Sequence, residues 1–348
     1  MMRTDSVFLK ACRREPVPYT PVWIMRQAGR YMKSYRDIRS KVSFMELCKN
    51  KELASEVTVR AAEQLGVDAA IIFSDILLIA EPMGLKLEYD TPQGPAIRGG
   101  ISTKEQVDRI PEVRPEETLA FVADAVRLTR ARLKPDLPLI GFCGAPFTLG
   151  AYLIEGGGSK QFVRTKQWIK DDAGAWHALM EKLVRGLAGY LKMQVAAGAD
   201  ALQIFDSWAG CLSPQEYRDY ALPHSQALIR AVGNKVPIIY FGTGTAPFLK
   251  EFASAGADVI GVDSQIGLNA AWDIIGPQKA IQGNLDPQIL FSTPELIEQE
   301  VKKILDQADG RPGHIFNLGH GILPATPEEN ASALVEIVHR LSRTASGK

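Results

Sequence analysis

The sequence is poor in cysteine, and its four cysteines lie far apart. They are Cys12, Cys48, Cys143 and Cys211, and no CxxC pair occurs. Zinc sites of standard spacing and disulfide frameworks both need cysteines at close or regular intervals. We therefore expect no metal site and no disulfide framework, which is typical of proteins from the reducing cytoplasm.

The sequence also lacks an excess of charge of either sign. Lys and Arg total 40, as do Asp and Glu, so the formal net charge is zero. No overall charge points to nucleic acid or to a membrane surface, and any basic site must be local. No apolar run reaches the roughly 18 residues of a spanning helix, and the first residues show no apolar core of a signal peptide. We expect a cytoplasmic protein that binds neither nucleic acid nor membranes.

Several common motifs of enzymes and nucleotide-binding proteins are missing. The glycine-rich segment 156–160 is not a Walker A loop, and GTGTAP at 242–247 lacks the third glycine of a dinucleotide fingerprint. GxSxG and HExxH do not occur, which argues against a hydrolase nucleophile elbow and a zincin metal site. The function must be sought in how the chain folds.

What the sequence does contain is a regular alternation of apolar runs and segments with helical spacing. The apolar runs are continuous rather than alternating, which is typical of strands buried on both faces of a parallel sheet. They lie at 21–25, 69–74, 138–144, 201–207, 237–243, 259–263, 280–284 and 314–320. Helical spacing occurs at 43–66, 115–133, 174–198, 213–233 and 293–305.

Eight strands alternating with helices predict an α/β fold, a (β/α)8 TIM barrel. A doubly wound sheet is the alternative, but it would normally carry a glycine-rich turn after its first strand, where this chain has RQAGRYM. The segment 84–100 breaks the alternation, and its TPQGP turn predicts a hairpin insertion. No linker, repeat or low-complexity tract occurs, so we expect one domain over 1–348 with its core at about 5–343.

Polar residues follow several predicted strands, and a barrel gathers strand ends at one face. They are Arg26, Gln27, Arg30, Tyr31, Asp75, Tyr152, Asp206, Ser207, Trp208 and His320. Asp75 lies in an otherwise apolar run, and a buried, unpaired carboxylate costs roughly several kcal/mol. Its partner must come either from the chain or from a ligand.

Each of these residues also has a purely structural interpretation. Asp75 could cap a helix or pair with an internal arginine, and Asp206 could be an N-cap. Arg26 and Arg30 could be surface residues on a first helical turn, although the helix macrodipole disfavours cations there and an anionic ligand would resolve that conflict. His320, between two glycines, could be held by the backbone. Tyr152 alone is uninformative.

Six segments together carry a resemblance to a known family. PVWIMRQAGRYM (21–32), FSDIL (73–77), GAPFTLGAYLIEG (144–156), QIFDSWAG (203–210), GNLDP (283–287) and NLGHGI (317–322) resemble signature segments of the uroporphyrinogen decarboxylase family. The resemblance extends over nearly the whole chain. The Arg-Gln-Ala-Gly-Arg-Tyr segment is its most specific part, whereas YFGTGTAP (240–247) is variable and is assigned no role.

The resemblance implies a (β/α)8 barrel, usually a homodimer, that uses no metal or organic cofactor. The implied reaction removes the four acetate carboxyl groups of uroporphyrinogen III as carbon dioxide and yields coproporphyrinogen III in heme biosynthesis. Catalytic roles fall on Asp75, Arg26 and Arg30. The implied substrate-binding residues are Arg26, Gln27, Ala28, Gly29, Arg30, Asp75, Tyr152, Ser207 and His320.

The chemistry of these residues agrees with that substrate, which carries carboxylates at its rim and pyrrole N–H donors at its centre. Guanidinium groups bind carboxylates bidentately, which suits Arg26 and Arg30 to the rim. A carboxylate can accept several N–H bonds at once, which suits Asp75 to the centre, where it would stabilise a developing ring cation. The resemblance offers Arg26 as proton donor, directly or through water, although arginine is a reluctant acid.

Two other classes of function stay open on the sequence. Relatives of this fold transfer methyl groups using zinc held by His and Cys, chemistry that needs soft ligands. Here no His is followed two residues later by Cys, and a zinc titration would decide the question. A non-catalytic tetrapyrrole carrier would have a similar cavity, and only turnover would separate the two.

Overall fold

The computed structural model describes residues 5–89, 94–159 and 161–343. Seven parallel strands form one curled sheet, in the order β1-β4-β5-β6-β7-β8-β9. They are β1 Ala70–Ile71, β4 Leu139–Gly144, β5 Ala201–Asp206, β6 Ile238–Gly242, β7 Val259–Gly261, β8 Ala280–Gln282 and β9 His314–Ile315. All seven lie within apolar runs from which strands are predicted, and almost every strand residue is buried.

The segment predicted as the first strand closes this sheet into a barrel, but it is a single bridge rather than a strand. Val22 forms a parallel bridge with Phe316, just after β9, and Phe316 N donates to Pro21 O at 2.8 Å. On the other side, Asp68 N donates to Val22 O at 2.8 Å, just before β1. The predicted (β/α)8 barrel is therefore confirmed, but its first strand consists of a single bridged residue, Val22.

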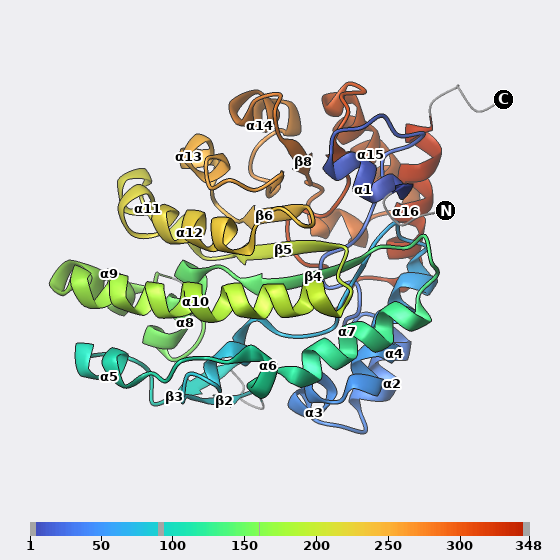
Figure 1. Ribbon diagram of the computed structural model, residues 1–348. Helices are drawn as coiled ribbons and strands as arrows, with labels where there is room; N and C mark the ends of the chain where they lie inside the picture. Colours follow the sequence, from blue (N-terminus) through green and yellow to red (C-terminus); the bar gives the residue numbers. More distant parts are fainter. Residues whose placement is uncertain (1–4, 90–93, 160, 344–348) are drawn as a thin grey trace.

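Helices surround the sheet (Figure 1). They are α1 Val7–Cys12, α2 Lys33–Arg39, α3 Phe44–Lys49, α4 Lys51–Leu65, α5 Lys104–Arg109, α6 Pro115–Thr118, α7 Ala120–Arg132, α8 Pro146–Glu155, α9 Val163–Asp171, α10 Ala173–Ala197, α11 Pro214–Tyr220, α12 Leu222–Val232, α13 Leu249–Ala253, α14 Leu268–Ile275, α15 Pro294–Ala308 and α16 Glu328–Ser342. Short 3-10 helices are η2 Ile76–Ala80, η3 Ala209–Cys211, η4 Ala246–Phe248 and η5 Pro287–Phe291.

Three predicted helices are each divided in two. The segment 43–66 breaks at Asn50, whose side chain accepts hydrogen bonds from Glu52 N and Leu53 N and so caps α4. The segment 213–233 breaks at Ala221, two residues before Pro223, which has no N–H to continue a helix. The segment 115–133 breaks at Leu119, where φ is −122°.

A hairpin interrupts the barrel between β1 and β4, as predicted for 84–100. Strands β2 Lys86–Glu88 and β3 Ala96–Arg98 are antiparallel, with Leu87 opposite Ile97. Part of the predicted TPQGP turn, residues 91–93, lies outside the described residues. The hairpin is tied to the end of α8, because Ile97 N donates to Gly156 O at 2.8 Å.

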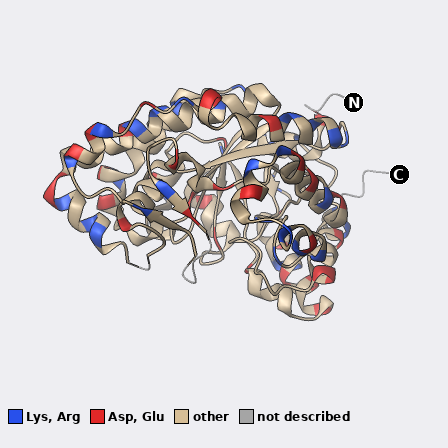
Figure 2. Cartoon of the chain, turned by 90° about the horizontal axis from the view of Figure 1, so that it is seen from below, with Lys and Arg blue, Asp and Glu red and all other residues tan. Residues whose placement is uncertain are grey.

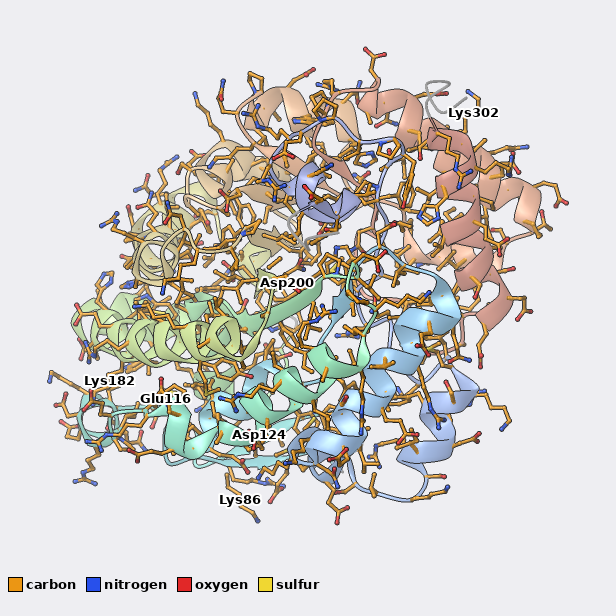
Figure 3. All side chains as sticks on the ribbon, turned by 45° about the vertical axis from the view of Figure 1, so that its right-hand side comes forward. Lys86, Glu116, Asp124, Lys182, Asp200 and Lys302 are labelled. Carbon is orange, nitrogen blue, oxygen red and sulfur yellow. The ribbon has the colours of Figure 1, made fainter. Side chains whose placement is uncertain are left out.

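Charged residues lie mainly on the outer helices (Figure 2). Figure 3 shows Lys302 on α15, whose ion pair with Asp306 is exposed, and Asp200 just before β5. Asp200 instead forms a partly buried pair with Arg130 at 3.2 Å and accepts from Leu139 N at 2.9 Å. No helix among the described residues is both long and apolar enough to cross a lipid bilayer.

Candidate active site

A cavity of about 310 Å³ lies where the strands end. One wall is aromatic, because Phe142, Phe205 and Phe241 come from the neighbouring strands β4, β5 and β6. Their rings meet edge to face, with centroids 5.6 Å and 6.1 Å apart. The polar lining comes from the first loop, from Asp75 and Ser207, and from His320. An apolar wall with charged edges suits a flat ligand that carries acidic groups.

The first loop, residues 24–32, brings Arg26 and Arg30 to this cavity. It is a series of turns that ends before α2, and Gln27 N donates to Ile24 O at 2.9 Å. The interpretation of Arg26 and Arg30 as residues of a first helical turn is therefore wrong, and the macrodipole argument attached to it does not apply. Arg26 has a φ of 64°, in the left-handed region that few residues other than glycine adopt.

Gly321 makes room for the side chain of Arg26. A Cβ atom at position 321 would lie 2.6 Å from Arg26 Cδ and 2.9 Å from Nε. The Arg26 side chain therefore runs over the backbone after β9 and enters the cavity beside His320. Burial and the neighbouring Arg26 charge lower the pKa of His320, so its ring stays neutral near pH 7.

The other members of this loop shape it from within. Gln27 is fully buried, and its backbone carbonyl accepts from the Tyr31 hydroxyl at 2.8 Å. Gly29 lies against Arg26 O, where a Cβ would approach to 2.9 Å. Gln27, Ala28 and Gly29 all line the cavity. The loop thus combines backbone close to the ligand with two flanking guanidinium groups.

Neither Arg26 nor Arg30 is paired with a carboxylate in the part of the chain that the structure describes. The backbone of Arg30 is held by Arg36, whose guanidinium donates to Arg30 O at 2.9 Å. Both Arg26 and Arg30 line the cavity and are exposed to it. Two unpaired guanidinium groups facing one cavity make a local site for anionic groups in a chain of zero net charge.

Asp75 lies on the cavity wall and caps a helix, which confirms its structural interpretation. Its Oδ1 accepts from Leu77 N at 2.8 Å at the start of η2. Burial raises its pKa, and the Tyr89 hydroxyl, Leu77 N–H and Arg26 charge oppose this rise. No cation forms an ion pair with Asp75 among the described residues. One backbone N–H does not compensate a desolvated carboxylate fully, which leaves capacity for ligand donors.

Ser207 follows β5 and lines the cavity. Its carbonyl accepts from Thr243 Oγ1 at 2.7 Å, so the GTGTAP segment, to which the sequence assigned no role, supports the Ser207 backbone. Tyr152 does not line the cavity. It lies on α8 with its ring edge-on to Trp208 at 5.8 Å, and burial raises its pKa.

Asp206, one of the polar residues expected at a strand end, has a role that the sequence did not indicate. It is the N-cap of no helix in the described part of the chain. Its carboxylate is fully buried and accepts hydrogen bonds from Thr148 Oγ1 at 2.7 Å and Tyr240 Oη at 2.6 Å. Burial raises its pKa to about 6, against these two bonds. Thr148 Oγ1 in turn accepts from Trp208 N at 3.2 Å, so Asp206 braces the loop of Ser207 from behind. The segment QIFDSWAG marks the residue but not this role, because its partners are distant in sequence.

The zinc alternative requires a cluster of metal-ligating side chains. Among the residues that the structure describes, no group of three His, Cys, Asp or Glu side chains could hold an ion. The four cysteines are unpaired and three are buried. Burial raises the pKa of Cys211 to about 11, which disfavours the thiolate that binds metal.

Comparisons with known proteins agree in sequence and in fold. Residues 3–341 match the family model described as "Uroporphyrinogen decarboxylase (URO-D)". The chain is 50% identical to a protein named uroporphyrinogen decarboxylase from Carboxydothermus hydrogenoformans, over 97% of each chain. It is 51% identical to one of the same name from Chloroflexus aurantiacus, over 95% of this chain and 94% of that protein.

Two solved structures share the fold at low sequence identity. A methyltransferase from Methanosarcina mazei superposes with a TM-score of 0.80 and 22% identity, over 96% of this chain and 98% of that one. A B12-independent methionine synthase from Shewanella sp. W3-18-1 superposes with a TM-score of 0.58 and 14% identity, over 86% and 91%. Identities this low carry the fold alone.

Proposed function

The chain belongs to the uroporphyrinogen decarboxylase family, and from this premise we propose that it is a carboxy-lyase of heme biosynthesis. It removes the four acetate carboxyl groups of uroporphyrinogen III as carbon dioxide and yields coproporphyrinogen III. The observation that carries the proposal is the meeting of Asp75 with two unpaired arginines in one cavity. That arrangement matches a ligand with N–H donors at its centre and carboxylates at its rim.

Substrate binding follows from the charges around the cavity. Arg26 and Arg30 bind rim carboxylates, and each charge-assisted hydrogen bond contributes roughly 1.5–3 kcal/mol. Asp75 accepts the pyrrole N–H groups with its free lone pairs. Ser207 and His320 add hydrogen bonds to further carboxylates. The expectation that Tyr152 contacts the substrate finds no support in the cavity lining.

The reaction needs a group that accepts the electrons left when the C–C bond of the acetate breaks. A proton added to the adjacent pyrrole carbon gives a cationic ring, and that ring takes up the pair as carbon dioxide leaves. The methylene carbon then gains a proton and becomes the methyl group, and the pyrrole carbon releases the proton that it had taken up, which restores the aromatic ring. The substrate is its own electron acceptor, so no cofactor is required for this step.

Asp75 stabilises the ring cation as it forms. The carboxylate lies in a cavity with an aromatic wall, where a fixed charge acts more strongly than in water. Arg26, which the family resemblance offers as proton donor, delivers the proton through a bound water, because an arginine itself rarely releases one. Arg30 remains a binding group.

The test is an anaerobic assay with uroporphyrinogen III in the presence of a metal chelator, with products separated by chromatography. Stepwise loss of four carboxyl groups, unaffected by the chelator, is the expected result. Tight binding without release of carbon dioxide would instead indicate a tetrapyrrole carrier. If the protein neither binds nor converts uroporphyrinogen III, the proposal is overturned, and a zinc titration is the next step.

We also propose that the enzyme works as a homodimer in the cytoplasm. The support is membership of the family, since the resemblance implies a dimer, and a composition without excess charge or spanning segments. Sedimentation velocity over a range of concentrations tests the dimer: a single species of monomer mass at all concentrations would contradict it.

A further inference from the structure

The hairpin insertion brings a tyrosine to the back of Asp75. Tyr89 directly follows strand β2, and the hairpin is fixed to α8 by the bond from Ile97 N to Gly156 O and by a bridge between Ala96 and Gly157. The Tyr89 ring packs on Phe44, with centroids 4.4 Å apart. Phe44 lines the cavity, whereas Tyr89 does not. The tyrosine thus lies one layer behind the site.

The Tyr89 hydroxyl is buried and makes no hydrogen bond of acceptable geometry within the described part of the chain. Most buried hydroxyls in proteins have a partner, because an unsatisfied one is unfavourable. Strand β2, which ends just before Tyr89, packs against η2, the helix that Asp75 caps. Burial, and after it the Asp75 charge, raises the pKa of Tyr89. The hydroxyl therefore lies near enough to Asp75 to interact with its charge, but forms no hydrogen bond with it.

Asp75 has acceptor capacity left over. Its Oδ1 accepts from Leu77 N, and its carboxylate makes no second hydrogen bond to the protein among the described residues. The titratable groups that act on it come from the first loop, α3, the hairpin, α8 and α10. They are Arg26, Cys48, Tyr89, Tyr152 and Tyr190. Of these, the Tyr89 hydroxyl most opposes the effect of burial on the Asp75 pKa.

We propose that Tyr89 is a positioning residue for Asp75: its hydroxyl rotates to donate a hydrogen bond to the carboxylate and thereby keeps it ionised. Tyr89 acts through Asp75 and does not touch the substrate. This inference rests on the proposed decarboxylase function, since it assigns a purpose to the charge of Asp75. It also gives the hairpin a role, because the hairpin is the element that carries the hydroxyl.

The test is Tyr89→Phe, which removes the hydroxyl and keeps the ring on Phe44. A hydrogen bond to the charged form lowers a carboxyl pKa, so its loss raises the pKa of Asp75. The acidic limb of the kcat/KM profile should then move to higher pH by about 0.5 to 1 unit, a loss of roughly 3- to 10-fold on that limb. Activity at pH 8 should stay near that of the wild type.

Tyr220→Phe on α11 is the matched control, because it makes the same change at a distance from the cavity. Its profile should overlay that of the wild type. A Tyr89→Phe profile that also overlays the wild type would overturn the inference. A uniform loss at every pH would do the same, because it would indicate a structural role only.

A second measurement separates this inference from the proposed function. The carboxyl stretch of Asp75 can be titrated by infrared difference spectroscopy in substrate-free protein, with Asp75→Asn identifying the band. A higher midpoint in Tyr89→Phe than in the wild type supports the inference even if no decarboxylation is found. An unchanged midpoint refutes it even if the enzyme is active.

Discussion

Asp75 is the residue on which the proposed chemistry depends most, because its carboxylate carries the stabilising charge. Asp75→Asn removes the charge that stabilises the ring cation and directs amide hydrogens toward N–H groups. We expect the fold to be kept and kcat to fall by roughly 100- to 1,000-fold, as for the loss of other electrostatic stabilisers. Circular dichroism and anaerobic turnover measure the two effects, and turnover close to that of the wild type would contradict the mechanism.

Arg30 is expected to act in binding rather than in chemistry. Arg30→Ala removes a charge-assisted hydrogen bond from the rim of the substrate, so KM should rise by roughly 10- to 100-fold with a smaller change in kcat. The backbone of residue 30 would still be held by Arg36, so stability should change little. Steady-state kinetics with thermal unfolding checks both, and an unchanged KM would count against the rim assignment.

Gly321 offers a way to displace Arg26 without mutating it. In Gly321→Ala the new methyl group would meet Arg26 Cδ at 2.6 Å, and the guanidinium must move. A misplacement of about 1 Å can reduce activity roughly 100-fold, so we expect a fall in kcat/KM of that order. Gly158→Ala is the control, because a Cβ there meets nothing within 4 Å and φ is not positive. Equal activity in both variants would show that activity does not depend on the position of the Arg26 side chain over Gly321.

At the scale of elements, the packing of α10 against α12 carries a pH dependence. His177 Nδ1 and His224 Nε2 lie 2.8 Å apart across this interface, and burial together with His177 lowers the pKa of His224 to about 4. In the unfolded chain the pKa of this histidine is about 6.5. Between pH 6.5 and pH 4 the folded state therefore holds fewer protons than the unfolded state. The contribution of neutral, buried His224 to the free energy of unfolding is therefore fully present above pH 6.5 and is lost as the pH falls toward 4.

Between pH 7 and pH 5 this histidine should reduce the free energy of unfolding by about 2 kcal/mol. Urea denaturation at the two pH values measures the loss, and His224→Gln should make it smaller, since a neutral amide does not titrate. His314 in β9, with its pKa lowered to about 4 by burial, should keep part of the effect. An identical loss in His224→Gln would exclude the interface as its source.

The elements themselves could be predicted to different degrees. Strands were found in place because their runs are apolar throughout, and helix ends at Gly66 and Gly198 were marked by glycines with φ of 68° and 116°. The breaks at Asn50 and Leu119 were not predicted, because helical spacing continues across them. Asn50 caps a new helix because the chain changes direction there, and helical spacing alone does not show that change.

At the scale of the whole molecule, Asp68 fastens the closure of the barrel. Its carboxylate accepts from Val22 N at 2.8 Å and from the Tyr19 hydroxyl at 3.0 Å, and it pairs with His339 Nε2 at 2.7 Å. One side chain thereby joins the bridge segment, the start of β1 and α16. Asp68→Ala should lower the free energy of unfolding by about 3 kcal/mol, since bonds to a charged group contribute roughly 1.5–3 kcal/mol each.

Urea denaturation checks this loss, and Asp68→Asn should lose less, because its amide oxygen can still accept from Val22 N. Asp68 itself does not line the cavity. We therefore expect kcat at low temperature to be nearly unchanged in Asp68→Asn. A stability of Asp68→Ala equal to that of the wild type would show that the barrel closes without this carboxylate.

The convergence of the site was predictable from the barrel alone, because Arg26, Asp75, Ser207 and His320 each follow a strand. What was not predictable is the layer behind them. Asp206 was expected at a strand end, but its bracing role depends on Thr148 and Tyr240, and no spacing rule links these partners to it. Tyr89 likewise acts through a residue that no spacing rule links to it. A sequence identifies residues at strand ends, whereas the contacts that brace them emerge only from three-dimensional packing.

The left-handed backbone of Arg26 has a consequence for directed evolution. A φ of 64° at a residue with a Cβ costs roughly 1–2 kcal/mol, a cost that Gly or Asn largely avoids. A library screened only for thermostability would therefore favour exchanging Arg26 and would discard the guanidinium that faces the cavity. Selection for this enzyme must include turnover, because at this position heat resistance and activity demand different residues.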